Sequence, residues 1–120
     1  MAVILVVDHA RADRELLGRV ITGAGHRAIL VSDGKEAIAV ARSQKPALIF
    51  LDLATPTLDG FATCRTLTRD PETAAIPVVL VTSKSTDSNV FWGKKQGAAD
   101  HLGKPWDKTT VETLIDNYCK

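Results

Sequence analysis

Several polar residues that directly follow apolar stretches of the sequence are of types that can do chemistry together. They are, in chain order, Asp8, His9, Asp52, Thr82, Ser83 and Lys104. A carboxylate can act as a nucleophile or bind a metal ion, a hydroxyl can donate a hydrogen bond, and an ammonium can stabilise negative charge. Because these residues are far apart in the chain, they form one site only if the fold brings them together.

The apolar stretches themselves predict strands. Five short runs rich in β-branched or aliphatic residues cover 3–7, 27–31, 47–51, 78–81 and, more weakly, 99–102. Three of the runs are apolar at every position. Strands of that kind are buried on both faces, which is typical of a parallel sheet covered by helices on each side.

Apolar residues at helical spacing lie between the predicted strands. The patterns cover 16–24, 37–41, 61–67, 86–96 and 111–118. The segment 86–96 has few apolar residues and an internal Gly93, so we expect its helix to be loosely anchored. Strand alternating with helix five times indicates an α/β fold with right-handed crossovers and a doubly wound sheet.

The expected site lies at the carboxyl ends of these strands, where doubly wound sheets bind their ligands. Asp8, Asp52, Thr82 and Lys104 all stand at such ends and are therefore expected to converge on one edge. For Asp8 alone, a role as a turn former or helix cap is equally reasonable. Asp52 is harder to explain in that way, because it ends a fully apolar run.

Two proline-containing segments are expected to shape the rim of this edge. Pro56 and Asp59-Gly60 predict a turn after Asp52, with Asp59 capping the next helix. Pro105 restrains the preceding Lys104 to an extended conformation, which favours a lysine that points into the site.

Length and composition fit a single globular domain over residues 1–120. Hydrophobic residues make up 45% of the chain and charged residues 24%, with a formal net charge of +1. Near-neutral charge gives no basis for nucleic-acid binding, and no apolar run is long enough for a membrane span or an export signal. We therefore expect a cytoplasmic protein that does not insert into membranes.

Particular motifs carry a resemblance to a known family. They are Ile4-Leu5-Val6-Val7-Asp8, Asp52 followed by Pro56 and Asp59-Gly60, Val81-Thr82-Ser83, and Gly97-Ala98-Ala99-Asp100 leading to Lys104-Pro105. Over nearly its whole length the chain resembles the receiver domain of bacterial two-component response regulators, of the chemotaxis-regulator (CheY-like) type. Residues 65–71 and 92–98 are similar to the response regulators of type IV pilus twitching motility (PilH-like). The resemblance implies a flavodoxin-like (βα)5 sheet with parallel strand order 2-1-3-4-5.

The resemblance also implies a phosphoryl-accepting mechanism. Asp52 would attack the phosphorus of a phosphohistidine on a partner kinase, while Lys104 and the hydroxyl of Thr82 would bind phosphoryl oxygens. Thr82 would then move inward, and the ring three residues before the lysine, here His101, would follow as the switch. Most relatives carry Tyr or Phe at that position, so His101 is a departure.

A second departure concerns the metal ion. The resemblance implies Mg²⁺ held by Asp8, Asp52 and the backbone carbonyl of Ala54, but relatives carry a second acid where this chain has His9. Imidazole is a poor ligand for Mg²⁺. Weaker Mg²⁺ binding, use of Mn²⁺ or Zn²⁺, a silent site, and a protonated His9 that itself supplies positive charge all remain open.

Two functions from different classes compete. The first is a stand-alone receiver without an output domain, phosphorylated on Asp52 by a histidine kinase or phosphotransfer protein and acting on a downstream protein target. Such a switch is not an enzyme beyond autophosphorylation from phosphodonors and self-dephosphorylation. The alternative is a phosphorylation-independent interaction module, favoured by His9. A small-molecule enzyme or flavin carrier lacks support, because no Gly-rich phosphate loop follows the first strand. Monomer and weak dimer both stay open.

Overall fold

Strands and helices alternate along the whole described chain. The computed structural model describes residues 1–55, 57–83 and 87–119, and only the backbone of Asp87 and Ser88. The predicted turn residue Pro56 and the first residue of segment 86–96 therefore lie outside the described residues. The elements are β1 (Val3–Val7), α1 (Arg11–Gly23), β2 (Arg27–Val31), α2 (Gly34–Gln44), β3 (Leu48–Asp52), α3 (Gly60–Arg69), β4 (Val78–Thr82), α4 (Asp87–Lys95), β5 (Asp100–Gly103) and α5 (Lys108–Tyr118).

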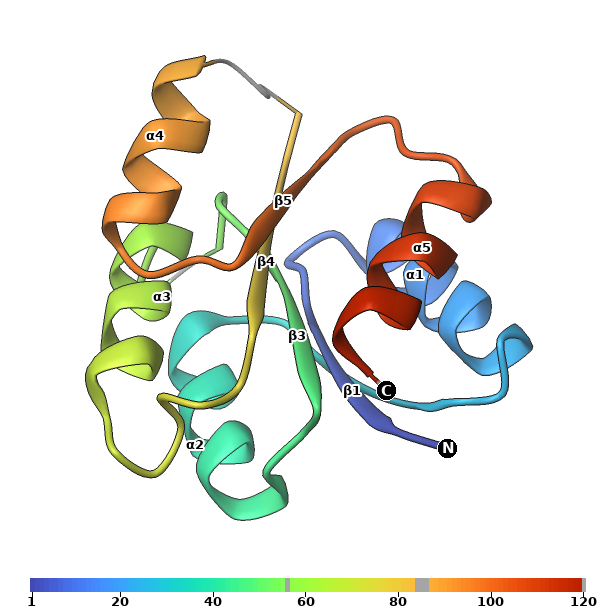
Figure 1. Ribbon diagram of the computed structural model, residues 1–120, viewed down its shortest axis with the longest axis horizontal. Coiled ribbons are helices and arrows are strands. Elements are labelled where there is room, and N and C mark those ends of the chain that lie inside the picture. Colours follow the sequence, from blue (N-terminus) through green and yellow to red (C-terminus); the bar gives the residue numbers. More distant parts are fainter. Residues whose placement is uncertain (56, 84–86, 120) are drawn as a thin grey trace.

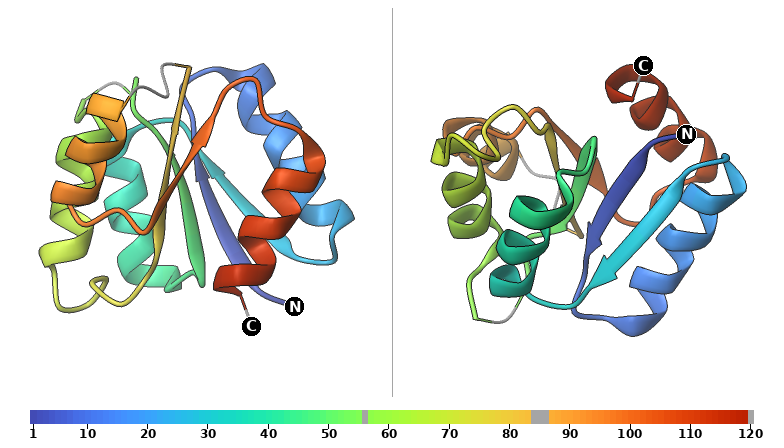
Figure 2. Two further views of the ribbon diagram at one scale, coloured as in Figure 1. Left: turned by 45° about the horizontal axis from the view of Figure 1, so that its top comes forward. Right: turned by 90° about the horizontal axis from the view of Figure 1, so that it is seen from below.

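The five strands form one parallel sheet in the order β2-β1-β3-β4-β5. Helices α1 and α5 cover one face and α2, α3 and α4 the other (Figure 1). Figure 2 shows the same layers from two further directions, with both ends of the chain at the end of the sheet where β1 begins. The predicted doubly wound fold and its strand order are confirmed.

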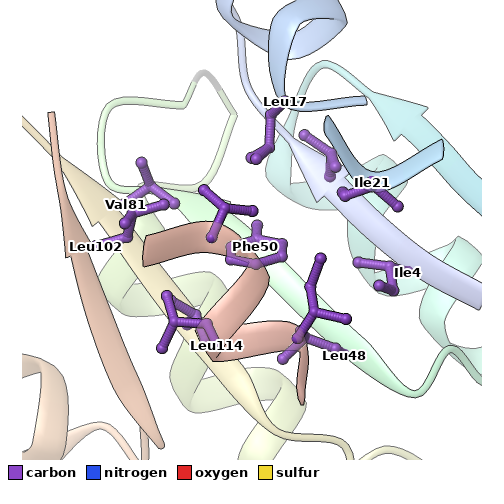
Figure 3. Packing of buried hydrophobic residues seen from close by; sticks show 12 residues of the cluster. Ile4, Leu17, Ile21, Leu48, Phe50, Val81, Leu102 and Leu114 are labelled. Carbon is purple, nitrogen blue, oxygen red and sulfur yellow. The ribbon is translucent and has the colours of Figure 1, made fainter. Parts of the chain in front are cut away.

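Each face of the sheet has its own hydrophobic core, because side chains alternate along a strand. Phe50 lies at the centre of the core under α1 and α5, fully buried between Leu17 and Ile21 of α1 and Leu114 of α5 (Figure 3). The core on the opposite face is built around Leu5, Ile49 and Leu80 with residues of α2 and α3. Two cores hold the sheet rigidly between the helix layers.

The alternation also decides which polar residue reaches which face at the carboxyl edge. Asp8 continues the series of Ile4 and Val6, Asp52 that of Leu48 and Phe50, and Lys104 follows Leu102 by two positions, all on the face of α1 and α5. Thr82 follows Leu80 on the opposite face. His101 also lies on that face, because it is adjacent in β5 to Leu102, which faces α1 and α5. The predicted site residues therefore divide between the two faces.

The first two strands have the predicted bounds, and the boundaries of the other three differ by one residue from the apolar runs. β3 begins at Leu48 and ends with Asp52, β4 ends with Thr82, and β5 covers Asp100–Gly103. Asp52 is paired with Val81 of β4 in the register, because backbone pairing continues past the last apolar side chain. Asp52 and Thr82 are thus held by the sheet itself rather than by the loops that follow.

The helices begin with aspartate caps at three places. The side chains of Asp33, Asp59 and Asp107 accept hydrogen bonds from the backbone N–H groups of Glu36, Ala62 and Thr110. The predicted cap at Asp59 is confirmed. Over the described part of the chain, no helix is both long and apolar enough to cross a membrane.

Candidate functional site

Lys104 is the centre of the polar groups at the carboxyl edge. Its Nζ atom donates to Oδ2 of Asp52 at 2.8 Å, to Oδ2 of Asp8 at 3.1 Å and to Oδ2 of Asp13 at 3.1 Å. Strands β1 and β3, helix α1 and the segment after β5 each supply one group. We call Asp8, Asp13, Asp52 and Lys104 the carboxylate cluster.

The second oxygens of the two strand carboxylates are bound by backbone. Oδ1 of Asp8 accepts from the N–H of Ala10, and Oδ1 of Asp52 accepts from the N–H of Ala54, both at 2.9 Å. Asp8 is 5% exposed and Asp52 8%. Both carboxylates are therefore fixed in orientation, and their Oδ2 atoms face Lys104.

Asp13 was not predicted from the sequence. It lies in the first turn of α1, four residues before Leu17 and eight before Ile21, which are two of the three buried residues of the helix. Residues at that spacing lie on one face of a helix, so Asp13 continues the buried stripe to the edge of the sheet. The stripe is visible in the sequence, and following it one turn toward the N-terminus would have found Asp13.

Burial and charge shift the pKa values of two members of the cluster. Burial raises the pKa of Asp8, and the charge of Asp52 adds to the rise, although the Ala10 N–H and Lys104 oppose it. Burial by itself lowers the pKa of Lys104, but the hydrogen bonds to Asp52, Asp13 and Asp8 together raise it above its ordinary value. Lys104 is thus a permanent cation at neutral pH.

Backbone hydrogen bonds hold the strand ends on which these groups stand. The N–H of Asp8 donates to the carbonyl of Val31, and the N–H of Lys104 donates to the carbonyl of Thr82 at 2.8 Å. The peptide bond between Lys104 and Pro105 is cis. Lys104 points into the site, as predicted.

His9 does not join the cluster. It is exposed, and its side chain makes none of the hydrogen bonds or ion pairs found among residues 1–55, 57–83 and 87–119. Its carbonyl and that of Asp8 face the guanidinium of Arg14, at 3.5 and 2.9 Å. Arg14 thereby fixes the turn between β1 and α1.

Thr82 ends β4, and Ser83 follows it at the carboxyl edge. Thr82 is buried and Ser83 exposed. A surface hollow of about 310 Å³ opens beside Ser83, and the described residues that line it are Asp13, Leu16, Ser83, Lys104, Pro105 and Trp106. The ammonium of Lys104 is therefore accessible from this side.

The predicted switch residue His101 lies on the opposite face of the sheet from the cluster. It pairs with Leu80 in the register of β4 and β5, two positions before Gly103, the partner of Thr82. A small hollow between β4, β5 and α4 is lined by His101, Leu80 and Gly93 among others. Thr82 and His101 are therefore diagonal neighbours on the face of the sheet that α4 covers.

The loop after β3 holds Asp52 at the rim. The N–H of Gly60 donates to the carbonyl of Leu53 at 2.9 Å, which closes the loop onto the strand end. A Cβ on Gly60 would lie only 2.5 Å from the Cα of Leu53 and 2.8 Å from the carbonyl oxygen of Asp52. Only glycine allows the backbone of residue 60 to lie this close to the end of β3. Ala54, which follows Asp52 by two residues, is exposed.

The donor set fits a hard divalent cation, because Asp8 and Asp52 offer carboxylate oxygens from buried, fixed positions. Those oxygens are bound to Lys104 instead, and among the described residues no three His, Cys, Asp or Glu side chains are grouped to hold a metal ion between them. A cation would have to compete with the ammonium of Lys104 for these oxygens.

Comparison with known proteins identifies the same arrangement of elements elsewhere. The model of the response regulator receiver domain family matches residues 4–116. Protein PilH of Pseudomonas aeruginosa is 40% identical over 116 residues, which are 97% of this chain and 96% of PilH.

Solved structures agree in fold. A putative response regulator from Chloroflexus aurantiacus superimposes with a TM-score of 0.93 at 26% identity, covering 98% of this chain and 96% of that one. The receiver domain of a sensor histidine kinase from Pseudomonas aeruginosa, solved with a magnesium ion coordinated in its active-site cleft, gives a TM-score of 0.90 at 22% identity over 98% of this chain and 96% of that one. At that lower identity the likeness concerns the fold alone.

Proposed function

The chain belongs to the response regulator receiver domain family, and from that premise we propose that it is a signalling switch phosphorylated on Asp52. The observation that carries the proposal is the buried carboxylate of Asp52 at the end of β3, bound by the ammonium of Lys104 at 2.8 Å. A fixed nucleophile next to a permanent cation suits a reaction with an anionic phosphoryl group.

The reaction is an in-line displacement at phosphorus. An oxygen of Asp52 forms a bond to the phosphorus of a phosphohistidine, the bond from phosphorus to the imidazole nitrogen breaks, and the freed imidazole takes up a proton. The product is an acyl phosphate on Asp52 and an unmodified histidine on the partner. Hydrolysis of the acyl phosphate by water returns Asp52 to its starting state.

Two side chains bind the phosphoryl oxygens in this proposal. Lys104 exchanges its contact with the Asp52 carboxylate for a phosphoryl oxygen and neutralises charge on it. Thr82, which ends the neighbouring strand β4, donates its hydroxyl to another phosphoryl oxygen. The backbone N–H of Lys104 donates to the carbonyl of Thr82, so the edge of the sheet holds the backbone of both residues next to each other.

Mg²⁺ bound by Asp8, Asp52 and the carbonyl of Ala54 would neutralise further negative charge on the phosphoryl group. Receiver domains bind Mg²⁺ in the active site, but here we expect this pair of acids to bind it weakly, with Mn²⁺ as a second choice. The reason is His9, whose imidazole stands where a further carboxylate would bind and does not reach the cluster.

The switch connects the two faces of the sheet. Movement of Thr82 toward the phosphoryl group would open space on its own face, where His101 is the diagonal neighbour on β5. His101 would enter that space and draw β5 and α4 with it. The surface of α4, β5 and α5 is then the face that a downstream protein reads.

The partner that supplies the phosphoryl group is a histidine kinase or phosphotransfer protein in the cytoplasm. The hollow beside Lys104 supports this, because the apolar side chains of Leu16 and Trp106 could receive the helix that carries the phosphohistidine. From the 40% identity to PilH over nearly the whole of both chains, we propose that the pathway is that of pilus twitching motility.

The experiment that tests the proposal is intact-mass spectrometry after incubation with acetyl phosphate and Mg²⁺ or Mn²⁺. The expected result is one added phosphoryl group on the peptide that contains Asp52, and none in the Asp52→Asn variant. Asp59→Asn is the matched control, since asparagine caps a helix as well as aspartate does and Asp59 lies in the same loop. This control should still be phosphorylated.

The alternative function is decided by the same measurement. If the chain takes up no phosphoryl group from acetyl phosphate with either metal present, or if the Asp52→Asn variant signals normally in the cell, the protein is a phosphorylation-independent interaction module. A phosphoryl group on Asp59 or elsewhere would equally contradict the assignment of Asp52 as the acceptor.

A further inference from the structure

A second surface hollow, of about 280 Å³, lies between α1 and β2. We call it the edge hollow, and the described residues that line it are Glu15, Gly18, Arg19, Thr22, Ala28 and Leu30. Gly18 leaves room for it, because a Cβ there would lie 3.0 Å from the Cδ2 atom of Leu30. Leu30 is 40% exposed. The edge hollow therefore offers an apolar floor to solvent, and it shares none of these residues with the hollow beside Lys104.

The backbone of β2 also presents polar groups at this place. β2 is the last strand on its side of the sheet, with α1 beside it (Figure 2). The N–H of Arg27 and the carbonyl of Val31 hydrogen bond toward β1. Because the direction of bonding alternates along a strand, the N–H and C=O groups of Ala28 and Leu30 point away from β1. The two strand residues that line the edge hollow thus direct hydrogen-bonding groups to the outside of the sheet.

The two edge strands of the sheet differ in how they are protected. Edge strands usually carry charged residues, proline or bulges that prevent another chain from pairing with them. In β5, at the other edge, the carboxylate of Asp100 accepts from the N–H of His101 at 2.9 Å. In β2 only the first residue, Arg27, is charged, and the other four are apolar. β2 is therefore the edge that is open to an added strand.

The charges around the edge hollow indicate the chemistry of that strand. Arg19 is on its rim, with a side chain 73% exposed and 4.0 Å from the carboxylate of Glu15. Arg11 pairs with the same carboxylate at 2.9 Å, and Arg27 begins β2. Three arginines thus accompany one glutamate, while the acids at the start of α2 bind backbone N–H groups there. Guanidinium groups bind carboxylates strongly, so a segment that complements this edge is acidic.

We propose that β2 and the edge hollow form a docking site for an extended acidic segment of a partner protein. The segment pairs with the outward N–H and C=O groups of Ala28 and Leu30 and so adds a strand to the sheet. One of its apolar side chains fills the edge hollow against Leu30, and carboxylates on either side bind Arg19 and Arg27. This interaction goes beyond the proposed function, because it uses neither Asp52 nor a phosphoryl group.

The test is NMR spectroscopy of the full chain, labelled with ¹⁵N, during titration with a capped peptide that has one leucine between two runs of three glutamates. The amide signals of Ala28 and Leu30 are expected to shift, and exchange of their N–H groups with solvent should slow about tenfold, because the peptide binds them. The N–H of Ile29, which bonds toward β1, is the internal control and should change little. A peptide with lysine in place of glutamate should bind about tenfold more weakly.

Two pairs of variants test the edge hollow and its charge. Gly18→Ala fills the hollow and should weaken binding of the glutamate peptide at least about fourfold, the loss expected for one buried CH₂ group. Gly23→Ala on the same helix meets no heavy atom within 4 Å and should leave binding unchanged. Arg19→Gln should weaken binding about threefold, whereas Arg65→Gln, an exposed arginine of α3, should not. Circular dichroism checks that each variant is folded.

Three results would overturn the proposal. The first is the absence of shifts at Ala28 and Leu30 up to about 1 mM glutamate peptide, the weakest affinity expected of such a contact. The second is equal binding of the lysine peptide. The third is a free chain that sediments as a dimer with these two N–H groups already protected, because β2 would then be an interface between copies. All measurements use the unphosphorylated chain, so their outcome does not depend on the proposed function.

Discussion

The two faces of the sheet differ in how firmly they hold the residues of the site. On the face of α1 and α5, the carboxylate cluster is held by a continuous set of ion pairs and backbone hydrogen bonds, and Asp8 and Asp52 are almost completely buried. On the opposite face, Gly93 is the one buried residue among the described side-chain positions of α4, and a Cβ there would lie 2.7 Å from Leu80.

Exposure on α4 reinforces this difference. Phe91 and Trp92 are each 55% exposed and pack against one another edge to face, with Lys95 over the ring of Phe91. Few buried contacts mean a low local stability. A receiver needs both properties, because the chemical groups must be fixed in advance while the element that reports their state must be able to shift. The predictions below test whether the division between the faces is real.

The largest effect is expected from removing the cation of the carboxylate cluster. Lys104→Met leaves three carboxylates without their partner and should lower the free energy of unfolding by about 3 kcal/mol, at the lower end for buried ion pairs because the lysine side chain keeps 20% of its exposure. Lys94→Met on α4 is the matched control and should change stability by less than about 0.5 kcal/mol. Urea unfolding at neutral pH measures both, and similar losses in the two variants would remove the distinction between the faces.

A steric change at the rim of Asp52 should have the next largest effect. Gly60→Ala places a methyl group against the backbone of Leu53 and should destabilise the fold by about 2 kcal/mol, as overpacking does. Gly23→Ala, at the end of α1, meets no heavy atom within 4 Å and should be neutral or stabilising by up to about 1 kcal/mol. Thermal unfolding of the two variants gives the comparison, and an unchanged melting temperature for Gly60→Ala would mean that the loop is not tightly closed.

Much of the site could be predicted from the sequence because strands are short and parallel. Once the apolar runs are identified, Asp8, Asp52 and Lys104 must stand at one edge, and the structure brings them together. The division of the polar residues between faces also follows from alternation, since Thr82 is an odd number of positions from Val81 and Val79 in the α1 and α5 core. The observed ends of β3, β4 and β5 differ by one residue from the predicted ends. Strand pairing depends on backbone hydrogen bonds, whereas the prediction used the apolar side chains.

Asp13 could not be found by the reasoning that found the others. It follows no strand, and the helical pattern was traced only through apolar residues, which begin at Leu16 and Leu17. Extending the buried stripe one turn toward the N-terminus would have included Asp13, but its contact with Lys104 also depends on the height of the helix relative to the sheet edge. The exposure of His9 was likewise hidden, because the turn fixed by Arg14 decides where that side chain points.

The two tryptophans offer a milder test of the difference between the faces. Trp106 packs against the core under α1 and α5, so Trp106→Ala should cost about 1.5 kcal/mol of stability. Trp92→Ala on α4 should cost less than about 0.5 kcal/mol, because more than half of the side chain is exposed. Chemical denaturation followed by circular dichroism avoids the loss of fluorescence signal. A larger loss from Trp92 would show that α4 is anchored more firmly than its exposure indicates.

The smallest effect concerns the cap of α5, the helix that begins just after the Lys104 segment. The backbone N–H and the hydroxyl of Thr110 bind the carboxylate of Asp107 and hold its pKa below the ordinary value of 3.8. A lowered folded-state pKa gives stability that is present above the unfolded value and is lost as the pH falls through the folded value. The parent chain should therefore exceed Asp107→Asn in stability near neutral pH, and the difference should shrink below pH 3.8.

Asp107→Ser keeps an uncharged cap, so its stability should run parallel to that of Asp107→Asn at every pH. A difference between parent and Asp107→Asn that stays constant down to the acid transition would show that the carboxylate charge contributes nothing at this end of α5.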